Sequence, residues 1–412
     1  MVQYIVLDEE ALRRIDLEYC RRSLEEMVSI PSVVGGEGDL AEYLRGSLEA
    51  LGMEAHLQEV EAGRFNVVAV HRYPRPGPIL MYNGHIDTVP VCEGWTVDPF
   101  KPVVRGSHLY GLGSLDMKAG IACILTHLKA VIESEAPLNG VLAFTGVVDE
   151  EGHSKGARAL LKTEMAKADA VVIGEPWTGI GERAIPLGIT GKILYELTVK
   201  GRAAHGFSPH LGVNAVEEAA RILVNLDRLE MRSHPNFGRG NLCTLKIEGG
   251  YTVYSVVVPD RCRVEVNRLL VPGESTSTAI EDMRRLIASL GLRAEVEVGL
   301  KPPYYEPFEM DKDLPMVRIF SEAFREVYGR PPDFQYAKSI TDGNVFMGEG
   351  GIPTIHFGPG GGGAHQPDEH VDLTTLNSTI KVYIKTTLKF LMGMPRPRPC
   401  NADYGLNDPH IV

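Results

Sequence analysis

The stretch Met81–Gly120 reads MYNGHIDTVPVCEGWTVDPFKPVVRGSHLYGLGSLDMKAG and carries His85, Asp87 and Asp116. The apolar run Pro78–Tyr82, just before His85, is typical of a buried strand. Open α/β sheets bind ligands beyond the carboxyl ends of their strands, so His85 and Asp87 stand where a site is expected. A histidine can bind a metal through one ring nitrogen while a nearby carboxylate orients the other. Taken alone, however, a His-x-Asp pair is usually structural.

Three further apolar runs have the same organisation. With the polar residues that follow them, they are Val141–Val148 with Glu150 and Glu151, Ala170–Ile173 with Glu175, and Thr354–Phe357 with His365. Parallel strands would bring all these carboxyl ends to one edge of a sheet. Asp116 is expected to open an amphipathic helix over Met117–Ile132 and to add an oxygen ligand there. We interpret the four glycines at 360–363 as a tight turn that brings backbone close to the site, rather than as a flexible surface loop.

Composition and charge exclude several classes of protein. A chain of 412 residues with 44% hydrophobic content is too long for one ordinary core and predicts two domains. The net charge of -12, without any Lys/Arg-rich run, argues against a nucleic-acid partner. No apolar run approaches about eighteen residues, and acids at 8–10 interrupt the start, so we predict no membrane association, no signal peptide and a cytoplasmic location. The six scattered cysteines predict neither disulfides nor a thiolate metal site.

The pattern of elements changes along the chain. Helical spacing over Glu9–Val28 and Leu40–Leu51, followed by alternating strands and helices up to Glu175, predicts an α/β domain with a mostly parallel sheet. The regular alternation of Lys192–Lys200 predicts a half-exposed strand instead. From there the order strand, helix, strand, strand, helix, strand is ferredoxin-like. We therefore predict a discontinuous main domain (residues 1–188 and 305–395), an inserted α+β domain (189–304) and an irregular C-terminal tail (396–412).

A series of motifs extends over nearly the whole chain. In order they are GHIDTVP, LYGLGSLDMKAG, VDEEG, GEP, GRAAHGFSPHLGVNA, VPD, VNR, PGE, TDGN and GPGGGGAH. This set resembles the dinuclear-zinc M20 family of peptidases and deacylases, which includes aminoacylases, acetylornithine deacetylase, succinyl-diaminopimelate desuccinylase and glutamate carboxypeptidases. The resemblance implies a zinc-hydrolase fold in which a catalytic domain with a mostly parallel sheet carries an inserted dimerisation or lid domain.

The same resemblance implies a metal centre and a role for each of its residues. Two divalent ions per chain are expected, with zinc first and manganese or cobalt as alternatives. Glu150 would act as the general base that takes a proton from water and delivers it to the leaving nitrogen. Asp87 would orient His85. The implied ligand sets are His85, Asp116 and Glu175 for one ion, and Asp116, Glu151 and His365 for the other, with Asp116 as the bridge.

Three residues are candidates for contacts with the substrate. His205 matches a family histidine that reaches the site of a neighbouring subunit and stabilises the oxyanion, so we expect a homodimer. Arg268 shares a strand face with Val264 and Val266, so it needs an anionic partner. The resemblance assigns it a substrate carboxylate, and the alternative is a local acid. Asn344 lies in the TDGN motif, where substrate recognition is implied.

Departures from the family pattern leave the exact substrate open. Where the family usually has Arg, Gly, Asn and Arg, this chain has Leu112, Ala119, Ser255–Val256 and Asn344. Glu175, rather than Asp, is the form typical of the deacylase branches. The sequence therefore favours a metal-dependent amidohydrolase acting on a small N-acylated amino acid. The first alternative is a dipeptidase, a carboxypeptidase or a hydrolase of another C-N bond. The second is a non-catalytic metal- or peptide-binding homologue, against which the presence of Glu150 argues.

Overall fold

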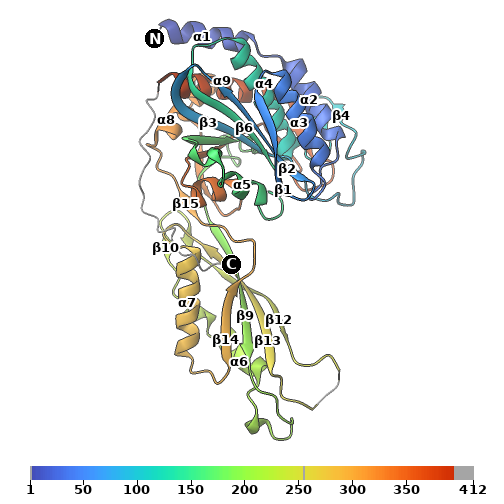
Figure 1. Cartoon of the computed structure of the whole chain (residues 1–412), viewed down its shortest axis with the longest axis vertical. Coiled ribbons are helices and arrows are strands. Elements are labelled where there is room, and N and C mark those ends of the chain that lie inside the picture. The colour runs from blue at the N-terminus through green and yellow to red at the C-terminus, as the bar shows by residue number, and fades with distance from the viewer. Residues whose placement is uncertain (1, 254–255, 394–412) are drawn as a thin grey trace.

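The chain folds into two domains that follow one another along the long axis of the molecule (Figure 1). The computed structural model describes residues 2–253 and 256–393, so the predicted tail and Ser255 lie outside the described residues. The main domain contains one large hydrophobic core, and the inserted domain has a separate, smaller core. None of the helices in the described ranges combines the length and apolar character needed to cross a membrane.

A six-stranded sheet forms the centre of the main domain, with the order β1-β2-β6-β3-β7-β17. Strands β6, β3, β7 and β17 are parallel neighbours, whereas β1 and β2 form the antiparallel side. The four strands predicted to gather polar residues at one sheet edge are therefore adjacent and parallel, which confirms that expectation. The strands are β1 (Glu54–Glu61), β2 (Arg64–Arg72), β3 (Arg75–His85), β6 (Asn139–Val147), β7 (Ala170–Ile173) and β17 (Thr354–His356).

Helices pack against this sheet and against one another (Figure 1). The predicted helix Glu9–Val28 is in fact two helices, because the Asp16 carboxylate accepts the backbone N-H of Tyr19 at 2.9 Å and starts a new one. The helices of the main domain are α1 (Val2–Arg13), α2 (Leu17–Ser29), α3 (Gly38–Ala50), α4 (Ala119–Glu133), α5 (Lys155–Leu160), α8 (Pro315–Tyr328) and α9 (Leu376–Gly393).

The helix after Asp116 also differs from the prediction. Residues Ser114–Lys118 form a distorted turn, η1, in which Asp116 has extended backbone angles, so α4 begins at Ala119. Helix α4 is buried on nearly all sides rather than amphipathic, because it packs between α2, α9 and β3. A Cβ atom on Gly120 would lie 1.9 Å from the carbonyl oxygen of Gly174, so glycine is needed where this helix passes the end of β7.

Two smaller sheets complete the main domain. One has the order β18-β19-β5-β4, and in it Gly361 pairs with Val371. The structure does not confirm the predicted approach of this glycine backbone to the site, because the backbone lies against strand β19, where a Cβ atom on Gly361 would be 2.2 Å from His370 O. The strands are β4 (Val103–Arg105), β5 (His108–Tyr110), β18 (Gly361–Gly362), β19 (His370–Asp372) and, in the second sheet, β8 (Ile185–Ile189), β15 (Phe308–Glu309) and β16 (Phe334–Ala337).

The inserted domain has an antiparallel sheet of order β12-β13-β9-β14. With one helix after the first strand and another after the third, this is the predicted ferredoxin-like arrangement. A short hairpin of β10 (Ser233–His234) and β11 (Gly238–Arg239) is added before β12. The main elements are β9 (Gly191–Lys200), α6 (Ala215–Leu223), β12 (Leu242–Gly249), β13 (Arg261–Leu270), α7 (Thr276–Ser289) and β14 (Glu295–Leu300).

Candidate metal centre

The first group of candidate ligands lies at the carboxyl ends of β3 and β7. His85 is the last residue of β3, and its Nε2 is 3.2 Å from Asp116 Oδ1 and 3.7 Å from Glu175 Oε1. Glu175 follows β7 by two residues. His85 and Glu175 are buried, whereas Asp116 is partly exposed from the η1 turn. One cation could therefore contact all three side chains.

A second group shares Asp116. Nε2 of His365 is 2.8 Å from Glu151 Oε1 and 3.3 Å from Asp116 Oδ2, so each oxygen of Asp116 faces a different histidine. In each group the potential ligand atoms lie within 4.8 Å of one another. These are the two sets that the sequence predicted. A third combination within the same distance joins His85, Glu150 and Glu151, so Glu150 stands beside the centre.

The ionisable side chains of the two ligand groups shift one another's pKa values. Burial and the Glu175 carboxylate raise the pKa of Glu150, although His85 opposes the shift. Burial would also raise the pKa of Asp116, but hydrogen bonds from His365 and His85 outweigh it and lower that pKa. Hydrogen bonds to Asp116 and Glu151 raise the pKa of His365 to about 10. Oxygen and nitrogen donors without sulfur match zinc, manganese or cobalt in a catalytic rather than a structural site.

Asp87 is placed differently from the prediction. Nδ1 of His85 is 3.0 Å from the backbone carbonyl oxygen of Asp87 but 3.8 Å from its carboxylate, so the backbone orients the imidazole. The carboxylate instead accepts the backbone N-H groups of Glu150 at 3.2 Å and Glu151 at 3.0 Å. Burial raises its pKa to about 6. Asp87 therefore fixes the turn that carries the proposed base and one ligand.

Two buried acids near the centre were not predicted. Glu369 accepts the backbone N-H groups of Gly113, Leu115 and Asp116 at 2.8, 2.9 and 2.8 Å. Its only signal in the sequence is its position four residues after His365. Asp342, in the TDGN motif, is 1% exposed, and burial raises its pKa to about 7 despite the nearby Ser154 hydroxyl.

The predicted substrate contacts lie outside this cluster in the single chain. His205 is exposed on the inserted domain, where its Nδ1 accepts the Phe207 N-H at 3.2 Å. Arg268 is completely buried and donates to Glu274 at 2.7 Å and to Asp282 at 3.2 Å. Arg268 thus pairs with local acids, as the alternative prediction stated, and its guanidinium group is not available to a substrate.

Asn344 is also unavailable to a substrate, contrary to the prediction. Its side chain is completely buried, and its amide nitrogen donates to the carbonyl oxygens of Thr190 and Glu306. The other departures from the family pattern that the structure describes, Leu112 and Ala119, are buried core residues, and Val256 is half-buried. None of these three supplies a polar side chain to the cluster.

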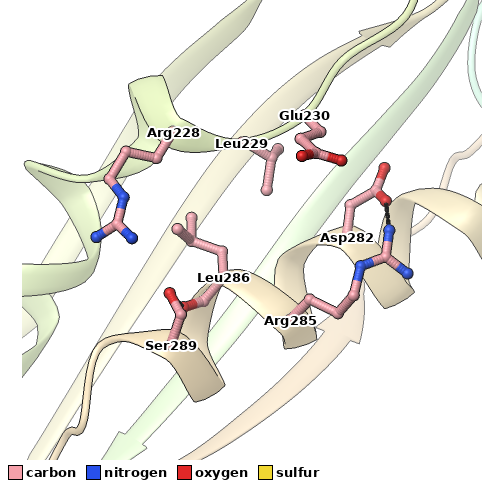
Figure 2. Close-up of a pocket in the computed structure, with 7 residues that line it drawn as sticks. All are labelled: Arg228, Leu229, Glu230, Asp282, Arg285, Leu286 and Ser289. Carbon is pink, nitrogen blue, oxygen red and sulfur yellow. Dashed lines mark hydrogen bonds and ion pairs between the residues drawn. The ribbon is translucent and has the colours of Figure 1, made fainter.

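A separate cavity of about 350 Å³ lies in the inserted domain between α7 and the short helix Leu226–Arg228. Figure 2 shows Leu229 and Leu286 between charged side chains, with Asp282 paired to Arg285. None of the residues that line this cavity belongs to the ligand groups. Two of its charged side chains, Asp282 and Arg285, neutralise each other in an ion pair. We therefore regard the cluster around Asp116, and not this cavity, as the functional site.

The fold and the site together define an α/β metallohydrolase with an inserted ferredoxin-like domain. The family model of Peptidase family M20/M25/M40 matches residues 81–389, so the chain belongs to this family. This confirms the resemblance seen in the motifs and makes the chain a hydrolase of C-N bonds.

Named relatives and solved structures agree with this assignment. The succinyl-diaminopimelate desuccinylase of Gluconobacter oxydans is 28% identical over 87% of this chain and 94% of its own length. Aminopeptidase PepT from Bacillus cereus has a similar fold, with a TM-score of 0.73 and 21% identity over 92% of this chain and 99% of its own. The YXEP protein of Bacillus subtilis, described as a dinuclear metal binding peptidase, also has a similar fold. Its TM-score is 0.66, with 18% identity over 91% of this chain and 98% of its own.

Proposed function

We propose that this chain is an amidohydrolase that removes the acyl group from a small N-acylated amino acid, using two divalent ions. The observation that carries the proposal is the pair of ligand groups that share Asp116, one with His85 and one with His365. The desuccinylase relatives, which match along most of the chain, support a deacylase over a peptidase. A dipeptidase, a carboxypeptidase or another C-N hydrolase with the same site is the alternative.

Zinc is the ion we propose first, with manganese and cobalt as alternatives, because the donors are imidazole and carboxylate. His85, Asp116 and Glu175 would hold one ion, and Asp116, Glu151 and His365 the other. Bound there, the ions would act as Lewis acids toward the scissile carbonyl and activate a water molecule.

Glu150 is the proposed general base. Its backbone N-H is held by the Asp87 carboxylate, so the base and the neighbouring ligand Glu151 are fixed by one group. A carboxylate at this position can take up a proton of the attacking water and then pass it to the leaving nitrogen.

We also propose a homodimer in which His205 of the partner subunit completes each site. Edge strand β12 leaves Leu245 and Ile247 58% and 49% exposed, and an apolar edge strand is suited to pairing with a second copy. His205 lies beside Phe207, which is 85% exposed.

Two further predictions stay proposals. The first is that the domain boundaries lie at 188/189 and 304/305. The second is a cytoplasmic location, which the five free cysteines of the described part favour.

A substrate panel tests the proposed reaction. The metal-free protein is loaded with zinc, manganese or cobalt in turn and assayed with N-acetyl and N-succinyl amino acids and with dipeptides, and Glu150→Gln is the control. Release of free amino acid from acylated substrates by the wild type, and not by the variant, is the expected result. Hydrolysis of dipeptides alone would favour the peptidase alternative. Failure on every substrate by fully loaded protein would favour a non-catalytic homologue.

A further inference from the structure

We propose that Asn344 is a positioning residue that sets the orientation of the inserted domain relative to the main domain, which carries the candidate metal centre. Its amide nitrogen donates to Thr190 O at 3.0 Å and to Glu306 O at 2.9 Å, and its Oδ1 accepts the Thr341 N-H at 3.1 Å. The nitrogen and the oxygen of this buried amide are thus all hydrogen-bonded to backbone groups. One side chain of the main domain therefore binds two segments that are far apart in sequence.

These two segments are the places where the chain crosses between the domains. Thr190 lies between β8 and β9, and Glu306 lies between β14 and β15. Next to them, Lys192 and Tyr305 pair through backbone hydrogen bonds of 3.0 and 2.8 Å, so the two crossings run side by side. A residue that holds both crossings therefore constrains how the inserted domain is oriented on the main domain.

Glu306 extends this connection into the inserted domain. Its carboxylate accepts the backbone N-H of Thr276, the first residue of α7, at 3.1 and 3.3 Å, and also the Thr276 hydroxyl. Helix α7 packs against β14 of the inserted sheet. The position of Glu306, which Asn344 fixes through the backbone, therefore also fixes the start of this helix.

The second crossing also touches the segment that follows the proposed base. The Tyr305 hydroxyl is 3.2 Å from Ser154 Oγ, and the Arg158 guanidinium lies 4.8 Å from the centre of the Tyr305 ring. Arg158 additionally donates to Tyr304 O at 2.6 Å. A displaced crossing would thus disturb both the inserted domain and the turn that carries Glu150.

Asparagine suits this role where arginine does not. A guanidinium group has five donors and no acceptor, so it could not accept the Thr341 N-H, and it is much larger than the completely buried amide. At the position where the resembling family usually has arginine, this chain therefore has a domain-positioning residue and no cationic group for the substrate. The effect on catalysis rests on the proposed function, but the effect on the crossings does not.

The test uses Asn344→Asp in the full-length, metal-loaded protein. The carboxylate keeps the acceptor oxygen but places a second oxygen against two carbonyls, which repels them. We expect amide hydrogen exchange at Lys192 and Tyr305 to become at least about tenfold faster. Bound metal stays unchanged, while kcat falls up to about 10²-fold through misplacement of the catalytic groups. Asn83→Asp is the matched control for hydrogen exchange, because Asn83 is a buried amide that donates to the carbonyl oxygen of Thr145 within the central sheet, away from the crossings.

Asn344→Arg distinguishes positioning from substrate recognition. If Asn344 positions the domains, this variant also speeds exchange at the crossings and lowers kcat equally for acetylated and succinylated substrates. A KM that falls only for succinylated substrates would overturn the proposal, as would unchanged exchange at Lys192 and Tyr305 in folded Asn344→Asp. If Asn344→Asp fails to fold, Asn344→Leu replaces it with the same readouts. Faster exchange at the crossings in a protein that is inactive on every substrate would support the positioning role and refute the proposed function.

Discussion

The carboxylate of Glu369 accepts the backbone N-H of Asp116 at 2.8 Å. It also accepts the N-H groups of Gly113 and Leu115, so the first half of the η1 turn is anchored on one buried acid. Because Glu369 follows His365 by four residues, it links the segments that carry the shared ligand and a histidine ligand. Glu369 thus has the geometry of a group that orients metal ligands without binding the metal.

Glu369→Gln should weaken metal binding. The amide has one acceptor oxygen, and its NH₂ group would face a backbone N-H, so at least one buried donor loses its partner at about 1–3 kcal/mol. Affinity for the ions should fall about 10- to 100-fold, as expected for a group that supports ligands. Competition with a chromophoric chelator measures this, and Glu42→Gln, on the exposed side of α3, is the control. Equal affinity in Glu369→Gln and wild type would show that the turn does not depend on the carboxylate.

Metal binding should release protons and strengthen as pH rises. In the metal-free chain, hydrogen bonds to Asp116 and Glu151 raise the pKa of His365 to about 10, so its ring is protonated at neutral pH. A proton and a cation compete for Nε2, so affinity increases with pH until the ring is neutral. Calorimetric titrations in buffers of different ionisation enthalpy give the number of protons released. Affinity that does not change between pH 6 and 9 would contradict the proposed ligand.

The adjacent acids Glu150 and Glu151 should respond differently to the same change. Glu150→Gln removes the proposed base, so kcat should fall by about 10² to 10⁴ with bound metal unchanged. Glu151→Gln removes a proposed ligand 2.8 Å from His365, so the ion held by that group should be lost. Elemental analysis of both loaded variants, against a wild type expected to hold about two ions per chain, separates the cases. Metal loss in Glu150→Gln instead would mean that the two roles are exchanged.

Arg268→Met should destabilise the inserted domain rather than weaken substrate binding. It leaves Glu274, which is only 8% exposed, without its cation, whereas Asp282 keeps its pair with Arg285. Breaking a buried ion pair in this way costs about 3–5 kcal/mol of unfolding free energy. Denaturant titration measures the loss, and kinetics at a temperature where the variant is folded measure KM. A stable variant with a strongly raised KM would restore the substrate-carboxylate role.

The parts of this structure that were predictable from sequence are those that leave a local pattern. Buried parallel strands are continuous apolar runs, so β3, β6, β7 and β17 and the ligands that follow them could be found. Glu369 and Asp116 are 253 residues apart, and periodicity contains no information about such a pair. Because Arg268 shares a strand face with Val264 and Val266, the sequence predicted a buried cation. Only the fold shows that its anionic partners are Glu274 and Asp282. The prediction for Asn344 was wrong because its partners are backbone groups. Every residue has a backbone carbonyl, so the sequence does not show which of them a side chain will contact.

The remaining prediction concerns action between subunits. His205 is exposed on the inserted domain and makes no hydrogen bond or ion pair with the proposed ligands in the described part of the chain. It can therefore donate to a developing oxyanion only when another subunit, or a moving domain, brings it to the site.

Mixing His205→Ala chains with Glu150→Gln chains tests this directly. Loss of one oxyanion donor lowers kcat about 10²- to 10³-fold, and loss of the base lowers it at least comparably, so each homodimer is nearly inactive. In a mixed dimer one site combines an intact Glu150 with an intact His205 of the partner subunit, so activity should return to about a quarter of wild type after random exchange. That fraction follows because half the dimers are mixed and each has one competent site. Sedimentation of differently tagged chains shows whether mixed dimers form. If they form without any return of activity, His205 acts within its own chain or has no role in the reaction.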